Sequence, residues 1–180
     1  MKRIVLIALL LTFNISLFTS CSKDEASKTY STANMVRCYF MVQQYTQLFN
    51  TMGSYGDFAT IHAIKTQSKL SMWSNIGTTE YPMTAEMRGF EFGLGGLIVG
   101  VNYYGEYMAF DLACPNCNRA NRRLSIGDAG IAKCAKCGLS YDLNNYGVIS
   151  AATSVSEYET PRGLFRYRIS YDGTNLSIFN

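Results

Sequence analysis

Four cysteines in the second half of the chain have the spacing of a metal site. Cys114 and Cys117 form one C-x2-C pair, Cys134 and Cys137 form another, and sixteen residues separate the pairs. Each pair can close a small loop around one ion, and two loops supply a complete tetrahedral shell of thiolates. Gly138 follows the second loop, where a glycine lets backbone amides turn toward the sulfurs. We therefore predict that these four cysteines bind one metal centre.

The type of ligand limits which metal the site would hold. Four soft thiolates favour zinc or iron over hard cations. A single zinc closed by four cysteines would be structural, a single iron would carry one electron as in rubredoxin, and a [2Fe-2S] cluster would use the same four cysteines. The symmetry of the two pairs favours a mononuclear site, and zinc is the metal we expect. The remaining alternatives are a pair of disulfides, Cys114–Cys117 and Cys134–Cys137, in an oxidising compartment, or a reduced site without metal.

Outside these cysteines the sequence offers little catalytic chemistry. His62 is the only histidine, so general bases that work near pH 7 are scarce, and we expect it to be an ordinary strand residue. The glycine-rich segment 93–96 enters a predicted strand, which indicates a bend and not a nucleotide-binding loop. Cys38 lies on an alternating apolar face and is expected to be a buried thiol. We find no catalytic constellation and expect no enzyme activity.

The first residues resemble the signal peptide of a bacterial lipoprotein. Lys2 and Arg3 precede an apolar run over residues 4–18, which is too short and too polar for a membrane-spanning helix. Small residues then lead directly into Cys21, which resembles a loosened lipobox of the Bacteroidetes type, with lipidation of that cysteine after cleavage. The polar residues 22–32 that follow are typical of a tether. The alternative is an ordinary secretory signal in which Cys21 is incidental.

The chain is therefore predicted to have three parts. These are a signal peptide over residues 1–20, a lipidated cysteine with its tether over residues 21–34, and a single domain over residues 35–180. The metal-binding loops span residues 112–143 of that domain. Cleavage after residue 20 would remove two of the 16 basic residues and leave 14 against 13 acidic residues. Without a basic excess, nucleic acid is not an expected partner.

The lipoprotein resemblance also implies a location and partners. We expect an outer-membrane lipoprotein of the cell envelope, attached to the membrane through its lipid and in contact with another envelope protein. The tetrad Ser22-Lys23-Asp24-Glu25 resembles an acidic surface-export signal, so exposure at the cell surface is one of the alternatives.

The remaining sequence favours short antiparallel strands. Apolar and polar residues alternate with period two, and turn signals such as Asp172-Gly173 separate the runs. Thirteen Tyr and ten Phe suit a pleated sheet better than a helix. We predict a short helix or turn over residues 43–52 and a loop-rich insertion over residues 69–89. The expected fold is all-β, an antiparallel β-sandwich or small barrel.

The order of the later segments resembles a Rieske domain. A strand over residues 96–101 leads through Gly105-Glu106 into residues 107–111, and the two cysteine loops follow. Tyr141-Asp142, a further glycine and a terminal hairpin complete the order. The resemblance covers about residues 92–180 and implies a Rieske-type sandwich with a separate subdomain that carries the cysteine loops.

The ligands depart from the Rieske pattern. A Rieske centre uses two cysteines and two histidines, whereas here Asn116 stands in the place of the first histidine and Cys137 in the place of the second. A histidine-ligated cluster is therefore not expected. The two loops are instead alike, as in rubredoxin and zinc ribbons, so we expect a subdomain of that kind.

Two functional hypotheses follow. In the first, a lipid-anchored envelope protein has a Rieske-like domain that is held by a structural metal and serves as a binding or assembly module. In the second, the protein carries electrons with iron or a [2Fe-2S] cluster on the same four cysteines. The two hypotheses predict different colours for the purified protein, because a zinc protein is colourless and either iron centre absorbs visible light.

The anchoring hypothesis predicts that Cys21→Ala releases the protein from membranes of its native host, because the lipid is attached through that thiol. Membrane fractionation of wild type and variant, with mass spectrometry for the acyl groups, measures this. Unchanged membrane partition of the variant, together with no acyl mass on the wild type, would contradict lipidation.

Overall fold

The computed structural model describes residues 38–43, 46–85, 87–151 and 161–180. The predicted signal peptide, Cys21 and the tether lie outside the described residues. Two antiparallel sheets and one α-helix, α3 (Thr46–Met52), make up most of the described chain. The strands of the larger sheet are, in chain order, β1 (Cys38–Gln43), β2 (Phe58–Ile64), β3 (Lys69–Ser74), β4 (Gly77–Pro82), β5 (Glu91–Phe92), β6 (Leu97–Val101), β7 (Tyr107–Asp111), β12 (Arg166–Tyr171) and β13 (Asn175–Phe179). The strands of the smaller sheet are β8 (Ser125–Ile126), β9 (Ile131–Lys133), β10 (Ser140–Asp142) and β11 (Val148–Ala151).

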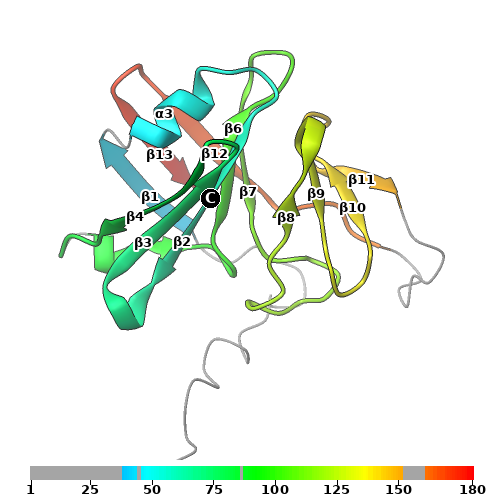
Figure 1. Ribbon diagram of the computed structural model, residues 1–180, viewed down its shortest axis with the longest axis horizontal. Helices are drawn as coiled ribbons and strands as arrows, with labels where there is room; N and C mark the ends of the chain where they lie inside the picture. Colours follow the sequence, from blue (N-terminus) through cyan, green and yellow to red (C-terminus); the bar gives the residue numbers. More distant parts are fainter. Residues whose placement is uncertain (1–37, 44–45, 86, 152–160) are drawn as a thin grey trace, which may run out of the picture.

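The larger sheet is open and curls around a first core (Figure 1). Its strand order is β4-β3-β2-β6-β7-β12-β13-β1-β5, so β4 and β5 are its two edges. Eight of its strands and α3 contribute buried side chains to the first core. The all-β, antiparallel class is therefore confirmed, whereas the sheet does not close into the small barrel that was one of the expected forms.

Three central strands of this sheet, β2, β6 and β7, are buried on both faces. In β6, Leu97 and Val99 belong to the first core, and Ile98 between them belongs to a second core on the outer face. Phe58 and Phe110 from the neighbouring strands share that second core. Burial on both faces explains why residues 97–101 form a continuous apolar run and not an alternating one.

The smaller sheet, in the order β11-β10-β9-β8, covers this outer face. In Figure 1 it stands beside β7, on the side of the larger sheet away from β1 and β13. Tyr141 of β10, with Leu139 before the strand and Leu143 after it, belongs to the second core. The two sheets are thus held together by one shared apolar layer, and the cysteine loops begin at the edge of this layer.

Residues 69–89 are not the predicted loop-rich insertion. β3 and β4 form an antiparallel hairpin in which Trp73 lies opposite Thr78, and Gly77 takes the left-handed conformation (φ +122°) at the turn. β4 is exposed along most of its length because it is an edge strand. A strand without a buried face has no alternating apolar pattern, which is why the sequence did not indicate it.

Of the residues 43–52, for which a short helix or turn was predicted, Thr46–Met52 form the helix α3, whereas Gln43 is the last residue of β1. Leu48 and Met52 are four residues apart, so both point into the first core from one helix face. The Gln47 amide nitrogen donates to Ser74 Oγ (3.0 Å) and to the carbonyl of Gly77 (2.7 Å), which attaches the helix to the β3–β4 turn. Among the described residues no helix is both long and apolar enough to cross a membrane.

A buried carboxylate connects the larger sheet to the start of the first cysteine loop. Asp111 Oδ1 accepts hydrogen bonds from the amides of Gly95 (3.1 Å) and Ala113 (2.9 Å), and Oδ2 accepts from the amide of Leu94 (2.7 Å) and the Tyr167 hydroxyl (2.8 Å). Burial raises the pKa of Asp111, and these four hydrogen bonds oppose that rise. Asp111 therefore holds the glycine-rich bend against the segment that enters the loop.

We expect Asp111→Ala to lower the free energy of unfolding by about 3 kcal/mol or more, because three amides and a hydroxyl lose their buried acceptor. Tyr167→Phe is the matched control: it removes one donor and should cost about 1 kcal/mol, since the carboxylate keeps its amide partners. Chemical denaturation measures both values. A loss for Asp111→Ala no larger than that for Tyr167→Phe would contradict the role given to this carboxylate.

Candidate metal centre

The two cysteine loops begin at strands of different sheets. Cys114 follows the end of β7 by three residues, and Cys134 directly follows β9. The amide of Cys114 donates to the carbonyl of Arg122 (2.8 Å), which closes the base of the first loop. Cys114 and Cys134 are fully buried in the second core, and Cys117 and Cys137 pack against it while remaining partly exposed. The second core therefore brings the two loops together.

The two loops repeat the same turn. The amide of Asn118 donates to the carbonyl of Cys114 (3.1 Å), and the amide of Gly138 donates to the carbonyl of Cys134 (2.9 Å). Both closing residues are left-handed, with φ +49° at Asn118 and φ +71° at Gly138. Asparagine tolerates this conformation better than most residues with a side chain. Asn118 thus closes the first loop as Gly138 closes the second.

Backbone amides surround the first sulfur of each loop. The amide of Cys117 donates to the thiol sulfur of Cys114, and the amides of Lys136 and Cys137 donate to that of Cys134. Hydrogen bonds to sulfur favour the thiolate, which is the form that binds metal. The turn predicted from Gly138 therefore does direct amides toward the sulfurs.

The four sulfurs converge. All of them lie within 4.8 Å of one another. Cys114 Sγ lies 3.6 Å from Cys137 Sγ, and Cys117 Sγ lies 3.6 Å from Cys134 Sγ, so each contact joins one loop to the other. Tetrahedral bonds of about 2.3 Å to one ion place two sulfurs about 3.8 Å apart. The cysteines are therefore close enough to hold one metal ion, which confirms that part of the prediction.

The disulfide alternative does not agree with this arrangement. All four cysteines are free thiols, and a sulfur–sulfur bond would be about 2.0 Å long. The sulfur contacts at 3.6 Å also connect different loops, whereas the alternative paired cysteines within each loop.

The thiols set each other's protonation. The pKa of Cys114 is raised, mainly by its hydrogen bond with Cys134 and secondly by burial. Burial raises the pKa of Cys117 to about 12. The hydrogen bond from Cys114 lowers the pKa of Cys134 to about 4, so one thiolate is stabilised by the protons of its neighbours. A metal must displace those protons, and its affinity should therefore increase with pH.

Two functional residues were missed by the sequence reasoning. Tyr141 is fully buried, and its hydroxyl lies 3.3 Å from Cys114 Sγ. The Asn116 amide nitrogen donates to the same hydroxyl oxygen (2.9 Å), which leaves the Tyr141 proton directed to the sulfur. Burial, with the hydrogen bond that the hydroxyl donates to Cys114, raises the pKa of Tyr141 and keeps this proton in place. The sequence indicates Tyr141 only as part of an aromatic-Asp pair, and no sequence pattern indicates a contact with sulfur.

Asn116 stands where the resemblance would have placed a histidine ligand, but its side chain makes structural hydrogen bonds. Its amide nitrogen also donates to the carbonyl of Arg162 (2.8 Å), and its amide oxygen accepts from the backbone amide of Arg162 (2.8 Å). Both ends of the amide are used in these contacts. Asn116 therefore positions Tyr141 and attaches the first loop to the segment before β12.

The other two residues singled out in the sequence lie elsewhere. His62 is a partly buried residue of β2 and is not part of the four-cysteine group. Cys38 is buried in the first core, whereas the metal site borders the second core, and burial raises the pKa of Cys38 to about 12. The prediction of a buried free thiol at Cys38 is confirmed.

We expect Tyr141→Phe to keep one metal per chain but to weaken its affinity about tenfold or more, because a hydrogen bond to a ligand is lost. Titration against a coloured chelator measures the affinity. Tyr167→Phe is the control, since that hydroxyl donates to Asp111 and Tyr167 belongs to the first core, whereas the metal site borders the second. Equal affinities in the wild type and both variants would contradict the role of Tyr141.

Comparison with known proteins does not assign the chain to a family. No protein-family model matches the chain, and no curated protein matches its sequence. The Rieske-type resemblance therefore remains a hypothesis that rests on the order of elements in this chain, and the functional argument rests on the geometry of the four cysteines.

Proposed function

We propose that this protein is a lipid-anchored protein of the cell envelope whose β-domain is stabilised by one structural metal ion and serves as a binding or assembly module. The ligands would be Cys114, Cys117, Cys134 and Cys137. The observation that carries the proposal is the convergence of these four sulfurs within 4.8 Å. The envelope location and the anchor at Cys21 are supported by the sequence of residues 1–34 alone.

The distances favour a single ion over a cluster. A two-iron cluster divides four thiolates between two irons, so it needs its two pairs of sulfurs farther apart than two ligands of one ion. Here all four sulfurs lie within 4.8 Å of one another, so the pairs are not separated in that way. Zinc is the ion we propose, because it favours four thiolates in a tetrahedral array and is redox-inert.

A structural role agrees with the dimensions of the smaller sheet. Its strands have only two to four residues each, and such short strands are not stable by themselves. A metal would join the loop after β7 to the loop after β9, next to the second core that holds the two sheets together. The free energy of metal binding would thus add to the folding stability of the smaller sheet, whose short strands bury little apolar area of their own.

The order of elements supports a Rieske-type domain as the fold we propose. β6 and β7 precede the first cysteine loop, β10 and β11 follow the second, and the β12–β13 hairpin ends the chain. The matching turns of the two loops support a subdomain of rubredoxin or zinc-ribbon type.

One observation favours electron transfer as the second candidate. Cys117 and Cys137 are partly exposed, so one side of the centre approaches solvent, where a redox partner could exchange electrons with iron. A single iron suits the sulfur distances better than a [2Fe-2S] cluster on the same four cysteines.

We expect Ser at any one of the four cysteines to reduce metal content and to lower the melting temperature, because three thiolates leave an open shell and metal binding is linked to folding. Cys38→Ser is the matched control and should leave the metal content unchanged, although it costs some packing. Elemental analysis of anaerobically purified protein, with a visible spectrum, measures this and distinguishes zinc from iron.

Near-zero metal in the wild type, with disulfides found by mass spectrometry, would contradict the metal site. Two irons with inorganic sulfide would contradict the single-ion proposal, and a single coloured iron would favour the electron carrier.

A further inference from the structure

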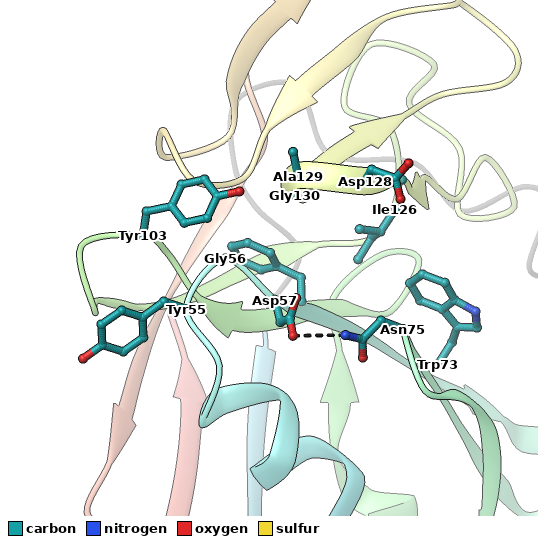
Figure 2. Close-up of a pocket in the computed structure, with 12 residues that line it drawn as sticks. Tyr55, Gly56, Asp57, Trp73, Asn75, Tyr103, Ile126, Asp128, Ala129 and Gly130 are labelled. Carbon is teal, nitrogen blue, oxygen red and sulfur yellow. Dashed lines mark hydrogen bonds between the residues drawn. The ribbon is translucent and has the colours of Figure 1, made fainter.

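A cleft of about 480 Å³ opens at the turn between β8 and β9 of the smaller sheet (Figure 2). Its roof is the turn between β8 and β9, residues 126–130, and its floor is the start of β2 at Asp57 and Phe58. Trp73 from β3 and Tyr103 from the β6–β7 turn form its sides. This volume is typical of sites for small ligands or single side chains. No residue of the cleft is a cysteine of the metal centre.

The cleft combines aromatic rings with acidic groups. Figure 2 shows the Tyr103 and Trp73 rings on two sides, with Asp57 between them and Asp128 on the opposite wall. The Asn75 amide nitrogen donates to Asp57 Oδ2 (3.1 Å), which fixes that carboxylate in the floor. None of the described residues that line the cleft is basic. The site is therefore negatively charged and rich in hydrogen-bond acceptors.

The roof and one side are locked together. Asn144 is buried; its amide nitrogen donates to the carbonyl of Ala129 in the roof (3.0 Å), and its amide oxygen accepts from the backbone amide of Tyr103 (3.2 Å). Ala129 is held in the left-handed conformation (φ +56°), which is unfavourable for alanine. A Cβ at Gly56 would collide with the Tyr103 ring, so this ring rests directly on the backbone. The cleft is thus shaped before any ligand binds.

We propose that this cleft binds an organic cation, either an amine or a guanidinium group. Such groups bring only hydrogen-bond donors, which matches a site of two carboxylates. Aromatic faces attract cations as well. The same group can come from a small molecule or from a Lys or Arg side chain of a partner protein. This inference is independent of the metal that the four cysteines hold.

Trp73 reports on the cleft, because it is the only tryptophan of the chain. We expect N-acetyl-arginine amide to change the Trp73 fluorescence of the isolated protein in a saturable way that weakens with salt. N-acetyl-citrulline amide has the same shape without the charge and should cause no such change. An equal response to both probes would overturn the proposal, and so would saturable binding of a neutral sugar without binding of the cation.

Two variants test the carboxylates. Asp57→Asn and Asp128→Asn should each weaken the affinity for N-acetyl-arginine amide about twofold to fivefold, as expected for exposed ion pairs. Glu91→Gln, an exposed acidic residue on β5, is the matched control and should have no effect. Melting temperatures show whether each variant is folded. Unchanged affinity in both aspartate variants would overturn the proposal.

The source of the cation is distinguished by a peptide. Gly-Gly-Arg-Gly-Gly amide that binds more than tenfold tighter than N-acetyl-arginine amide assigns the cleft to a basic segment of a protein partner. Equal affinities assign it to a small cationic molecule. Failure of both probes to bind would overturn the inference while leaving the metal proposal intact.

Discussion

The shared second core is the constraint on which the rest of the structure depends. The outer face of β2, β6 and β7 carries large apolar side chains, among them Phe58, Met108 and Phe110, and these must be removed from water. The smaller sheet provides the cover but is itself too short to be stable alone. Each sheet therefore needs the other, and the cysteine loops lie where the two meet.

Tyr141 shows how this core and the metal centre are physically continuous. Its ring fills the second core, and its hydroxyl reaches Cys114 Sγ with Asn116 holding the oxygen. A buried polar group is costly unless it is paired, so the packing of the ring and the position of the sulfur depend on each other. Loss of core packing would then change the environment of the sulfur as well as the stability of the fold.

The β8–β9 hairpin carries the two candidate sites at its two ends. Cys134 directly follows β9, and the turn before β9 forms the roof of the acidic cleft. β9 has only three residues, so the two sites are close along the chain although their chemistry is separate. A metal at the cysteine loops would stabilise the same hairpin, whereas the groups proposed to bind the cation do not include the metal.

The sequence by itself determined the features that depend on short separations. The spacing within each C-x2-C pair and the glycine at 138 determine a tight turn, the alternation near Cys38 marks a buried strand, and the period of two marks an all-β domain. Local geometry has few alternatives at such separations, so these predictions agree with the structure. The predictions for residues 1–34 lie outside the described residues and remain predictions.

Only the tertiary structure decided which groups meet over long separations. Asn116 and Tyr141 are 25 residues apart, and Asp111 and Tyr167 are 56 residues apart. The exposed strand β4 and the cleft at Trp73 also depend on neighbours that no periodicity indicates. Such contacts depend on how the two sheets pack, because a side chain pairs with whatever the shared core brings beside it, and sequence spacing does not specify that.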